Sequence, residues 1–191
     1  MKEERAEIFH RKRPYAPYFH FRDDKRGTEV GAVCDWLSAR FRVGPDSFAA
    51  LEYRQNPLDP PDVVLVDRSG IRHGIEVTEF VDGPTISAHL RDFSTDIREY
   101  GETEFRDLVI ERITVKSNAP FKDVTCATKS LIIYSDEPFF ICGDGVEFLR
   151  SFSAVNQSFF DEIWFMIPPA VNTSGGAPGN PHCRVYEIKR G

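Results

Sequence analysis

The sequence predicts a single α/β domain with a mixed central sheet. Segments whose apolar residues recur at helical spacing alternate with short apolar runs typical of buried strands. Two of these runs flank a turn signal at residues 67–70, which predicts a β-hairpin. The chain has 191 residues, of which 41% are hydrophobic, so it is long enough for one domain with a sizeable core.

The expected elements run in the order helix, three strands, helices, strand, helix and two strands. Helices are expected over residues 28–42, with Thr28 as the N-cap, and over 85–100, 102–118 and 145–155; strands are expected over 47–54, on both sides of the hairpin turn, and over 131–134, 139–142, 162–167 and 184–188. Residues 1–27 form a basic and aromatic leader before a domain of residues 28–191. Residues 168–182, rich in Pro, Gly, Asn and Ser, predict a flexible loop.

The predicted hairpin brings two acidic residues together. If Ser69 lies at the centre of the turn, residues whose numbers sum to 138 face each other, so Asp62 lies opposite Glu76. Side chains alternate between the two faces of a strand, so Thr78 shares their face. Neighbouring carboxylates repel each other, and a cation between them relieves the repulsion. The spacing therefore indicates a cation-binding carboxylate pair on one face of the hairpin.

This hairpin resembles the active-site hairpin of the PD-(D/E)XK nuclease superfamily, which has the restriction-endonuclease-like fold. One strand opens with Pro61-Asp62 and the next closes with Glu76-Val77-Thr78, within a helix–strand–hairpin–helix–strand order over residues 28–135. The resemblance implies a mixed central sheet flanked by helices. It also implies a metal-dependent hydrolase that cleaves phosphodiester bonds of DNA or RNA.

The resemblance carries a set of ligands for a divalent cation, Mg²⁺ or Mn²⁺. It implies that Asp62 and Glu76 bind the ion, helped by the backbone carbonyl of Val77. It also implies Glu29, in the first helix, as a further acidic ligand. An acidic residue in a first helical turn also stabilises the helix dipole, and this structural interpretation of Glu29 stays open.

The sequence departs from the superfamily motif at Thr78, which occupies the catalytic position of a Lys that positions or activates the attacking water. A threonine has no cationic group, so the resemblance implies that another residue supplies the charge. Alternatively, Thr78 is simply a β-branched strand residue. The sequence offers five candidates for the relocated cation and does not choose among them: Arg91, Arg98, Arg106, Lys116 and Lys129.

Two other classes of function stay open beside the nuclease. Thr78 and the net charge of −6 favour an inactive relative that binds nucleic acid or protein. An unrelated α/β enzyme would use the same two acids as an acid–base pair on a small molecule. The leader is a candidate contact for nucleic acid, or else it packs on its own domain. A homodimer is also left open, because nucleases of this fold often work as dimers.

Composition argues against several other classes. The four cysteines are scattered without a CxxC pair, which disfavours a zinc site and a disulfide scaffold and predicts reduced thiols in the cytoplasm. No apolar run approaches the roughly 20 residues that span a bilayer, and the N-terminus lacks the apolar segment of a secretory signal. Walker, HExxH and GxSxG motifs are missing from the sequence.

Overall fold

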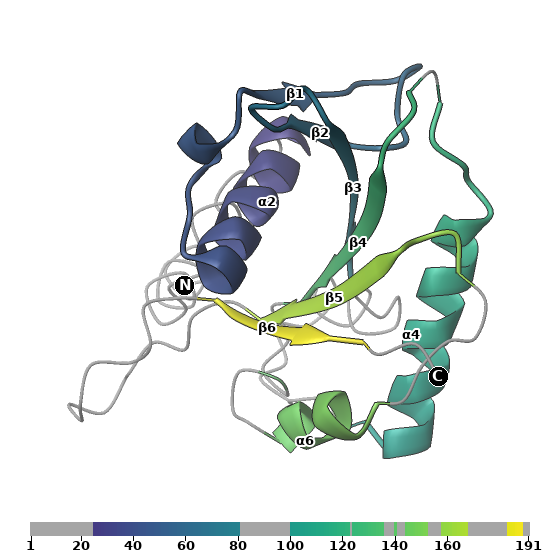
Figure 1. Ribbon diagram of the computed structural model, residues 1–191. Helices are drawn as coiled ribbons and strands as arrows, with labels where there is room; N and C mark the ends of the chain where they lie inside the picture. The colour runs from purple at the N-terminus through teal and green to yellow at the C-terminus, as the bar shows by residue number, and fades with distance from the viewer. Residues whose placement is uncertain are drawn as a thin grey trace, which may run out of the picture.

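The computed structural model describes residues 25–80, 100–122, 124–135, 140, 144–152, 158–167 and 183–188. This part of the chain is an α/β structure with a six-stranded mixed sheet (Figure 1). The strands are β1 (Ala50–Tyr53), β2 (Val63–Val66), β3 (Arg72–Glu79), β4 (Thr128–Tyr134), β5 (Glu162–Ile167) and β6 (Arg184–Glu187). The described α-helices are α2 (Lys25–Phe41), α4 (Glu102–Ser117) and α6 (Asp144–Ser151), and a 3₁₀ turn covers Pro45–Ser47.

Several predicted segments lie outside the described residues. They are the leader up to residue 24, the helix over 85–100 except residue 100, the strand over 139–142 except residue 140, and the loop over 168–182. Residue 140 is helical and not extended, so the strand prediction is wrong at that residue. Within the described ranges, no helix is long and apolar enough to cross a membrane.

The strands lie side by side in chain order, β1 to β6. β1, β2 and β3 form an antiparallel meander, β3, β4 and β5 are parallel, and β6 returns antiparallel to β5. The parallel strands β4 and β5 are apolar on both faces, because helices cover a parallel sheet on each side. The mixed central sheet that the sequence predicts is therefore confirmed.

The hairpin has the predicted register. Val63 lies opposite Ile75, and each further pair of the β2–β3 ladder keeps the same sum of residue numbers. The turn closes with a hydrogen bond from the N–H of Asp67 to the carbonyl of Ile71 (2.9 Å). Gly70 has a φ of 82°, a left-handed conformation that glycine adopts at little cost. The turn chemistry thus fixes which side chains meet further along the two strands.

Two apolar cores lie on opposite faces of the sheet (Figure 1). Between α2 and the sheet, the buried core includes Val33, Trp36, Leu37, Val63, Leu65, Ile75, Val77, Ile132, Trp164 and Met166. The other core, under α4 and α6, is rich in phenylalanine and includes Phe80, Phe105, Val109, Ile113, Leu131, Ile133, Phe140, Leu149 and Phe165. Because side chains alternate along β3, Val77 belongs to the α2 core while Glu76 faces α4.

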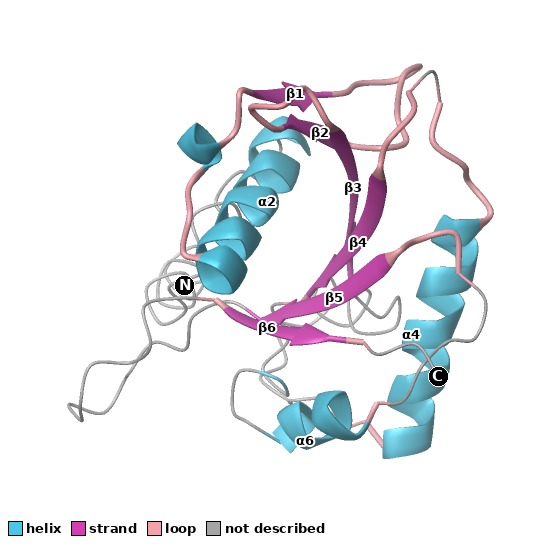
Figure 2. Ribbon diagram, in the orientation of Figure 1, coloured by secondary structure: helices cyan, strands magenta, loops and turns pink. Residues whose placement is uncertain are grey.

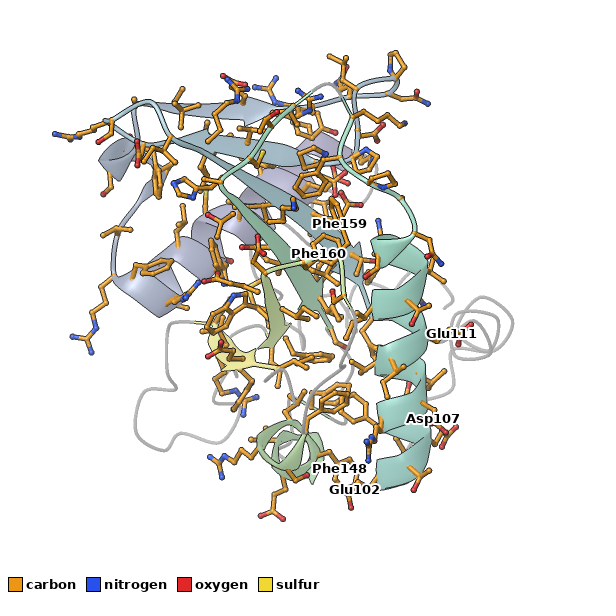
Figure 3. The ribbon with its side chains drawn as sticks, turned by 45° about the vertical axis from the view of Figure 1, so that its right-hand side comes forward. Glu102, Asp107, Glu111, Phe148, Phe159 and Phe160 are labelled. Atoms are coloured by element: carbon orange, nitrogen blue, oxygen red, sulfur yellow. The ribbon has the colours of Figure 1, made fainter. Side chains whose placement is uncertain are left out.

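Helix α4 presents its apolar stripe to the sheet. Phe105, Val109 and Ile113 recur every four residues and are all buried, as the helical spacing predicts. Figure 3 shows Asp107 and Glu111 on the outer side of this helix, away from the sheet. A side chain in the last turn of α4 that lies on the same side of the helix as this stripe therefore points toward β3.

Several predicted boundaries differ from the structure. β4 begins at Thr128 and not at residue 131, and α6 ends at Ser151 and not at residue 155. Helix α2 begins at Lys25, so Thr28 lies inside the helix instead of capping it, and the last residues of the predicted leader are helical. An ion pair between Lys25 and Glu29 (3.4 Å), one turn apart, supports this additional turn. The first strand begins at Ala50 and not at residue 47, because Pro45 favours a helical turn there.

Candidate functional site

Asp62 is held immediately before β2 by contacts on both sides. Its carbonyl accepts a hydrogen bond from the N–H of Arg54 (2.8 Å), the residue that follows β1. The guanidinium of Arg54 donates to the carbonyls of Leu58 (2.8 Å) and Lys122 (2.7 Å), and so ties the β1–β2 loop to the segment after α4. A further bond joins the N–H of Lys122 to the carbonyl of Pro60 (2.8 Å). Figure 2 shows these loops at the same end of the sheet.

Gly74 allows this segment to pack closely against β3. A Cβ atom at Gly74 would overlap the ring of Phe121 and lie 2.9 Å from the Sγ of Cys126. Phe121 in turn packs edge-on against Phe159, with ring centroids 5.2 Å apart. The missing side chain at Gly74 thus brings the residues after α4 close to the hairpin that carries the acidic pair.

The Asp62 carboxylate is bound to the neighbouring strand. Asp62 is 3% exposed, and its Oδ2 accepts a hydrogen bond from the N–H of Val77 (2.9 Å). Since Asp67 and Ile71 are a hydrogen-bonded pair, the alternating ladder makes residues 61 and 77 another such position. Pro61 has no N–H, so it cannot donate a hydrogen bond to the carbonyl of Val77. This carbonyl points to the same side of β3 as the N–H of Val77.

Glu76 meets a lysine from α4. Its carboxylate is buried, and its Oε1 lies 2.6 Å from the Nζ of Lys116, in the last turn of that helix. The other oxygen, Oε2, is also buried and has no hydrogen-bond partner among the described residues. The position opposite Asp62 is non-hydrogen-bonded in the ladder, where side chains lie closest. Asp62 and Glu76 are therefore close enough to act on each other electrostatically, and Glu76 has a lysine ammonium group beside it.

The remaining candidate cations differ in placement. Arg106 is exposed on α4, ten residues before Lys116, and the Nζ of Lys129 lies 4.8 Å from the ring of Phe159. Arg91 and Arg98 are outside the described residues. Of the three candidates that the structure describes, Lys116 is the one that forms an ion pair with the acidic pair.

Glu29 reaches the site from α2, on the other face of the sheet. It is 7% exposed, and its Oε2 is buried without a hydrogen-bond partner in the described part of the chain. The Nζ of Lys25 lies 3.4 Å from Glu29 Oε1 and 3.6 Å from Asp62 Oδ1, and it also contacts Asp59 Oδ2 (3.0 Å). Glu29 is thus joined to Asp62 through a shared ammonium group.

Sequence reasoning missed Lys25 and Asp59. Lys25 falls within the predicted leader of residues 1–27, and Asp59 is not among the predicted site residues. The signal for Lys25 is its spacing from Glu29, since residues four apart share a helix face once the helix begins at Lys25. Asp59 has no comparable local signal, because its contact with Lys25 spans 34 residues of chain.

The buried carboxyls have unusual proton affinities. Burial and the nearby charge of Asp62 raise the pKa of Glu76 to about 7, against the opposing effect of Lys116. The same two causes raise the pKa of Glu29 to about 7, although Lys25 opposes them. Burial disfavours the charged form of Lys25, but its hydrogen bond to Asp59 and the charges around it keep the Lys25 pKa above its ordinary value. Asp62 is therefore the common electrostatic neighbour of both glutamates.

Thr78 lies two residues beyond Glu76 on the same face of β3. It is half-buried and pairs with Ile133 of β4 in the ladder. Its position is the one that the sequence predicts. Its side chain is neutral, and the ammonium group that contacts Glu76 in the described part of the chain is that of Lys116.

The donors available at this site are oxygen atoms of carboxylates and of the backbone. In the described residues, no group of three or more His, Cys, Asp or Glu side chains has the arrangement of a metal cage. Mg²⁺ rarely uses such a cage and is usually held by one or two carboxylates while it retains several waters. The pair of Asp62 and Glu76, with an unsatisfied Oε2 on Glu76, is compatible with that kind of binding.

The raised pKa values predict that mild acid stabilises the protein in the presence of EDTA. In the unfolded chain both glutamates have ordinary values near 4.5, so between about pH 4.5 and 7 the folded protein holds protons that the unfolded chain has released. Stability should therefore fall as the pH rises toward 7. We expect a melting temperature a few degrees higher at about pH 5.5 than at about pH 8.

The Glu29→Gln/Glu76→Gln double variant isolates this effect, because it removes both titrating carboxyls and leaves the other ionisable groups in place. Its melting temperature should vary less with pH over the same range. An unchanged pH dependence in the double variant would contradict the assignment to these two residues.

Comparisons with protein-family models, with curated proteins and with solved structures found no match to this chain.

Proposed function

We propose that this protein is a metal-dependent nuclease of the restriction-endonuclease-like fold, hydrolysing phosphodiester bonds of DNA or RNA. The observation that carries the proposal is the contact between Lys116 and Glu76, beside Asp62. Through this contact Lys116 supplies an ammonium group to the acidic pair, although Thr78 occupies the position of the lysine in the superfamily motif. The order of helix, meander and parallel strands agrees with the same proposal.

A divalent ion fits the residues of this site. Asp62 and Glu76 would hold it, with the Val77 carbonyl as a third oxygen donor. Glu29 lies close enough to Asp62 for the two charges to interact, so the charge of a bound ion would also act on Glu29. When bound, the ion would polarise the phosphate and lower the pKa of a bound water. The buried Oε2 atoms of Glu29 and Glu76, which lack partners in the described part of the structure, support this assignment because buried polar atoms are normally satisfied.

The protein side chains have separate tasks in this proposal. Asp62 is held in place by the N–H of Val77, so its free lone pairs keep one direction. Lys116 takes the cationic role that the motif gives to a lysine, stabilising negative charge that grows on the phosphate. Thr78 offers a hydroxyl on the same strand face, without charge.

The experiment is a cleavage assay on labelled single- and double-stranded DNA and RNA with Mg²⁺ or Mn²⁺, paired with calorimetry of metal binding. We expect Asp62→Asn and Glu76→Gln each to abolish cleavage and to weaken metal binding at least tenfold. Asp107→Asn is the matched control, because Asp107 lies on the outer side of α4 (Figure 3), and it should behave as the unmodified protein. Cleavage that persists in the Asp62→Asn/Glu76→Gln variant would refute the proposal.

A second candidate is a catalytically inactive relative that binds nucleic acid or protein. The ion pairs of Lys25 and Lys116 favour it, because they already neutralise part of the acidic charge without a metal. This candidate predicts nucleic-acid binding that is unaffected by Mg²⁺, with no turnover of any of the four substrates. Metal-dependent cleavage would exclude it.

A further inference from the structure

Lys25 lies among three carboxylates, two from the β1–β2 loop and one from its own helix, α2. Its Nζ is 3.0 Å from Asp59 Oδ2, 3.4 Å from Glu29 Oε1 and 3.6 Å from Asp62 Oδ1. Asp59 and Asp62 belong to the β1–β2 loop, and Glu29 belongs to helix α2. The single ammonium group of Lys25 thus lies between all three of these carboxylates.

Lys25 and Lys116 approach the acidic pair from opposite faces of the sheet. α2 carries Lys25 and covers one face, while α4 carries Lys116 and covers the other (Figure 1). Lys25 contacts Asp62, and Lys116 contacts Glu76. Each carboxylate of the pair therefore has its own ammonium neighbour.

The net charge of the acidic and basic side chains at this site can be balanced by one divalent ion. Four carboxylates, Glu29, Asp59, Asp62 and Glu76, face two ammonium groups, Lys25 and Lys116. Two negative charges remain when all six groups are ionised, and Lys122 adds a further positive charge near Asp59. One divalent cation is therefore the most that these charges balance. A second divalent ion beside Asp62 would have to lie next to the ammonium of Lys25, and like charges at that separation repel strongly.

The side chain of Lys25 is exposed, in contrast to the carboxylates around it. The Lys25 side chain is 61% exposed, whereas the side chains of Asp62 and Glu29 are 4% and 9% exposed. Lys25 is therefore more accessible to solvent than the two buried carboxylates that its ammonium group contacts.

On the basis of the proposed nuclease function, we propose that Lys25 takes the place of a second divalent ion. The site then holds one divalent ion at Asp62 and Glu76, and Lys25 supplies the second positive charge toward the substrate phosphate. In two-metal sites both charges are ions about 3.5–4 Å apart, and they stabilise the attacking and leaving oxygens. Here one of the two charges belongs to the chain.

The test is the stoichiometry of Mn²⁺ binding to the full chain, measured by isothermal titration calorimetry. The unmodified protein should bind one ion. Lys25→Met frees Glu29, Asp59 and Asp62, so this variant should bind two ions, or bind one at least tenfold more tightly, while it cleaves more slowly. Lys25→Arg keeps the charge and should bind one ion. Arg68→Met removes one positive charge from the exposed hairpin turn and should also match the unmodified protein.

The outcomes separate this inference from the proposed function. Two ions bound by the unmodified protein would overturn the role of Lys25 and leave the nuclease proposal in place. Unchanged stoichiometry and affinity in a folded Lys25→Met variant would overturn it as well. No binding of Mn²⁺ by the unmodified protein would overturn the metal-dependent function itself, and the inference with it. Circular dichroism of each variant establishes that it is folded.

Discussion

Replacing Lys116 with Met is expected to lower kcat for nucleic-acid cleavage by about 10²–10³-fold, the typical effect of removing one charge-stabilising group. Divalent-ion binding should persist or become tighter. The reason is the position of Lys116: its Nζ lies 2.6 Å from Glu76 Oε1, so it competes with a metal ion for that oxygen. A residue that only held the metal site together would show the reverse, with weaker metal binding and a parallel loss of turnover.

Arg106→Met is the matched control for this prediction. Arg106 is exposed on the same helix, about 15 Å along its axis from Lys116, and it was an equal candidate from sequence. Its replacement should leave kcat and metal binding unchanged. Lys116→Arg should recover part of the activity, because it restores a positive charge in a different shape. Full activity in a folded Lys116→Met variant would remove Lys116 from the proposed mechanism.

The acidic pair was predictable because the information that places it is local. A turn of known chemistry sets the register of a hairpin, and the register then determines which side chains face each other. Asp62 and Glu76 lie 14 residues apart, so only the turn at Asp67–Gly70 has to be identified correctly. The buried strands β4 and β5 were predictable for a similar reason, since their continuous apolar runs are typical of parallel strands covered on both faces.

The cations of the site were not predictable to the same degree. Lys116 is 40 residues from Glu76, and its approach depends on how α4 packs across the sheet. Helical spacing identified its apolar stripe but not the strand that the stripe faces. Lys25 was missed because the helix begins before Thr28, and a boundary error of one turn changes which residues share a face.

The largest effect on stability is expected at Phe105, the first residue of the α4 stripe. Phe105 is fully buried, and its ring lies 5.5 Å from Phe80, 5.2 Å from Phe140 and 5.8 Å from Phe165, centroid to centroid. Phe105→Ala removes these contacts and leaves a cavity, which costs about 3–5 kcal/mol in the free energy of unfolding. For a chain of this size the melting temperature should fall by about 10 °C.

Urea unfolding measures this change, with Val115→Ala as the control on the same helix. Val115 is 60% exposed, so its truncation should shift the free energy of unfolding by less than about 0.5 kcal/mol. Lys116 follows Phe105 by three helical turns on the same side of α4, so the weakened anchoring of α4 should also reduce cleavage in Phe105→Ala well below the unfolding temperature. A variant that loses stability but keeps full turnover would show that the position of Lys116 is set by the last turn of α4 alone, near Ile113, and not by the phenylalanine core.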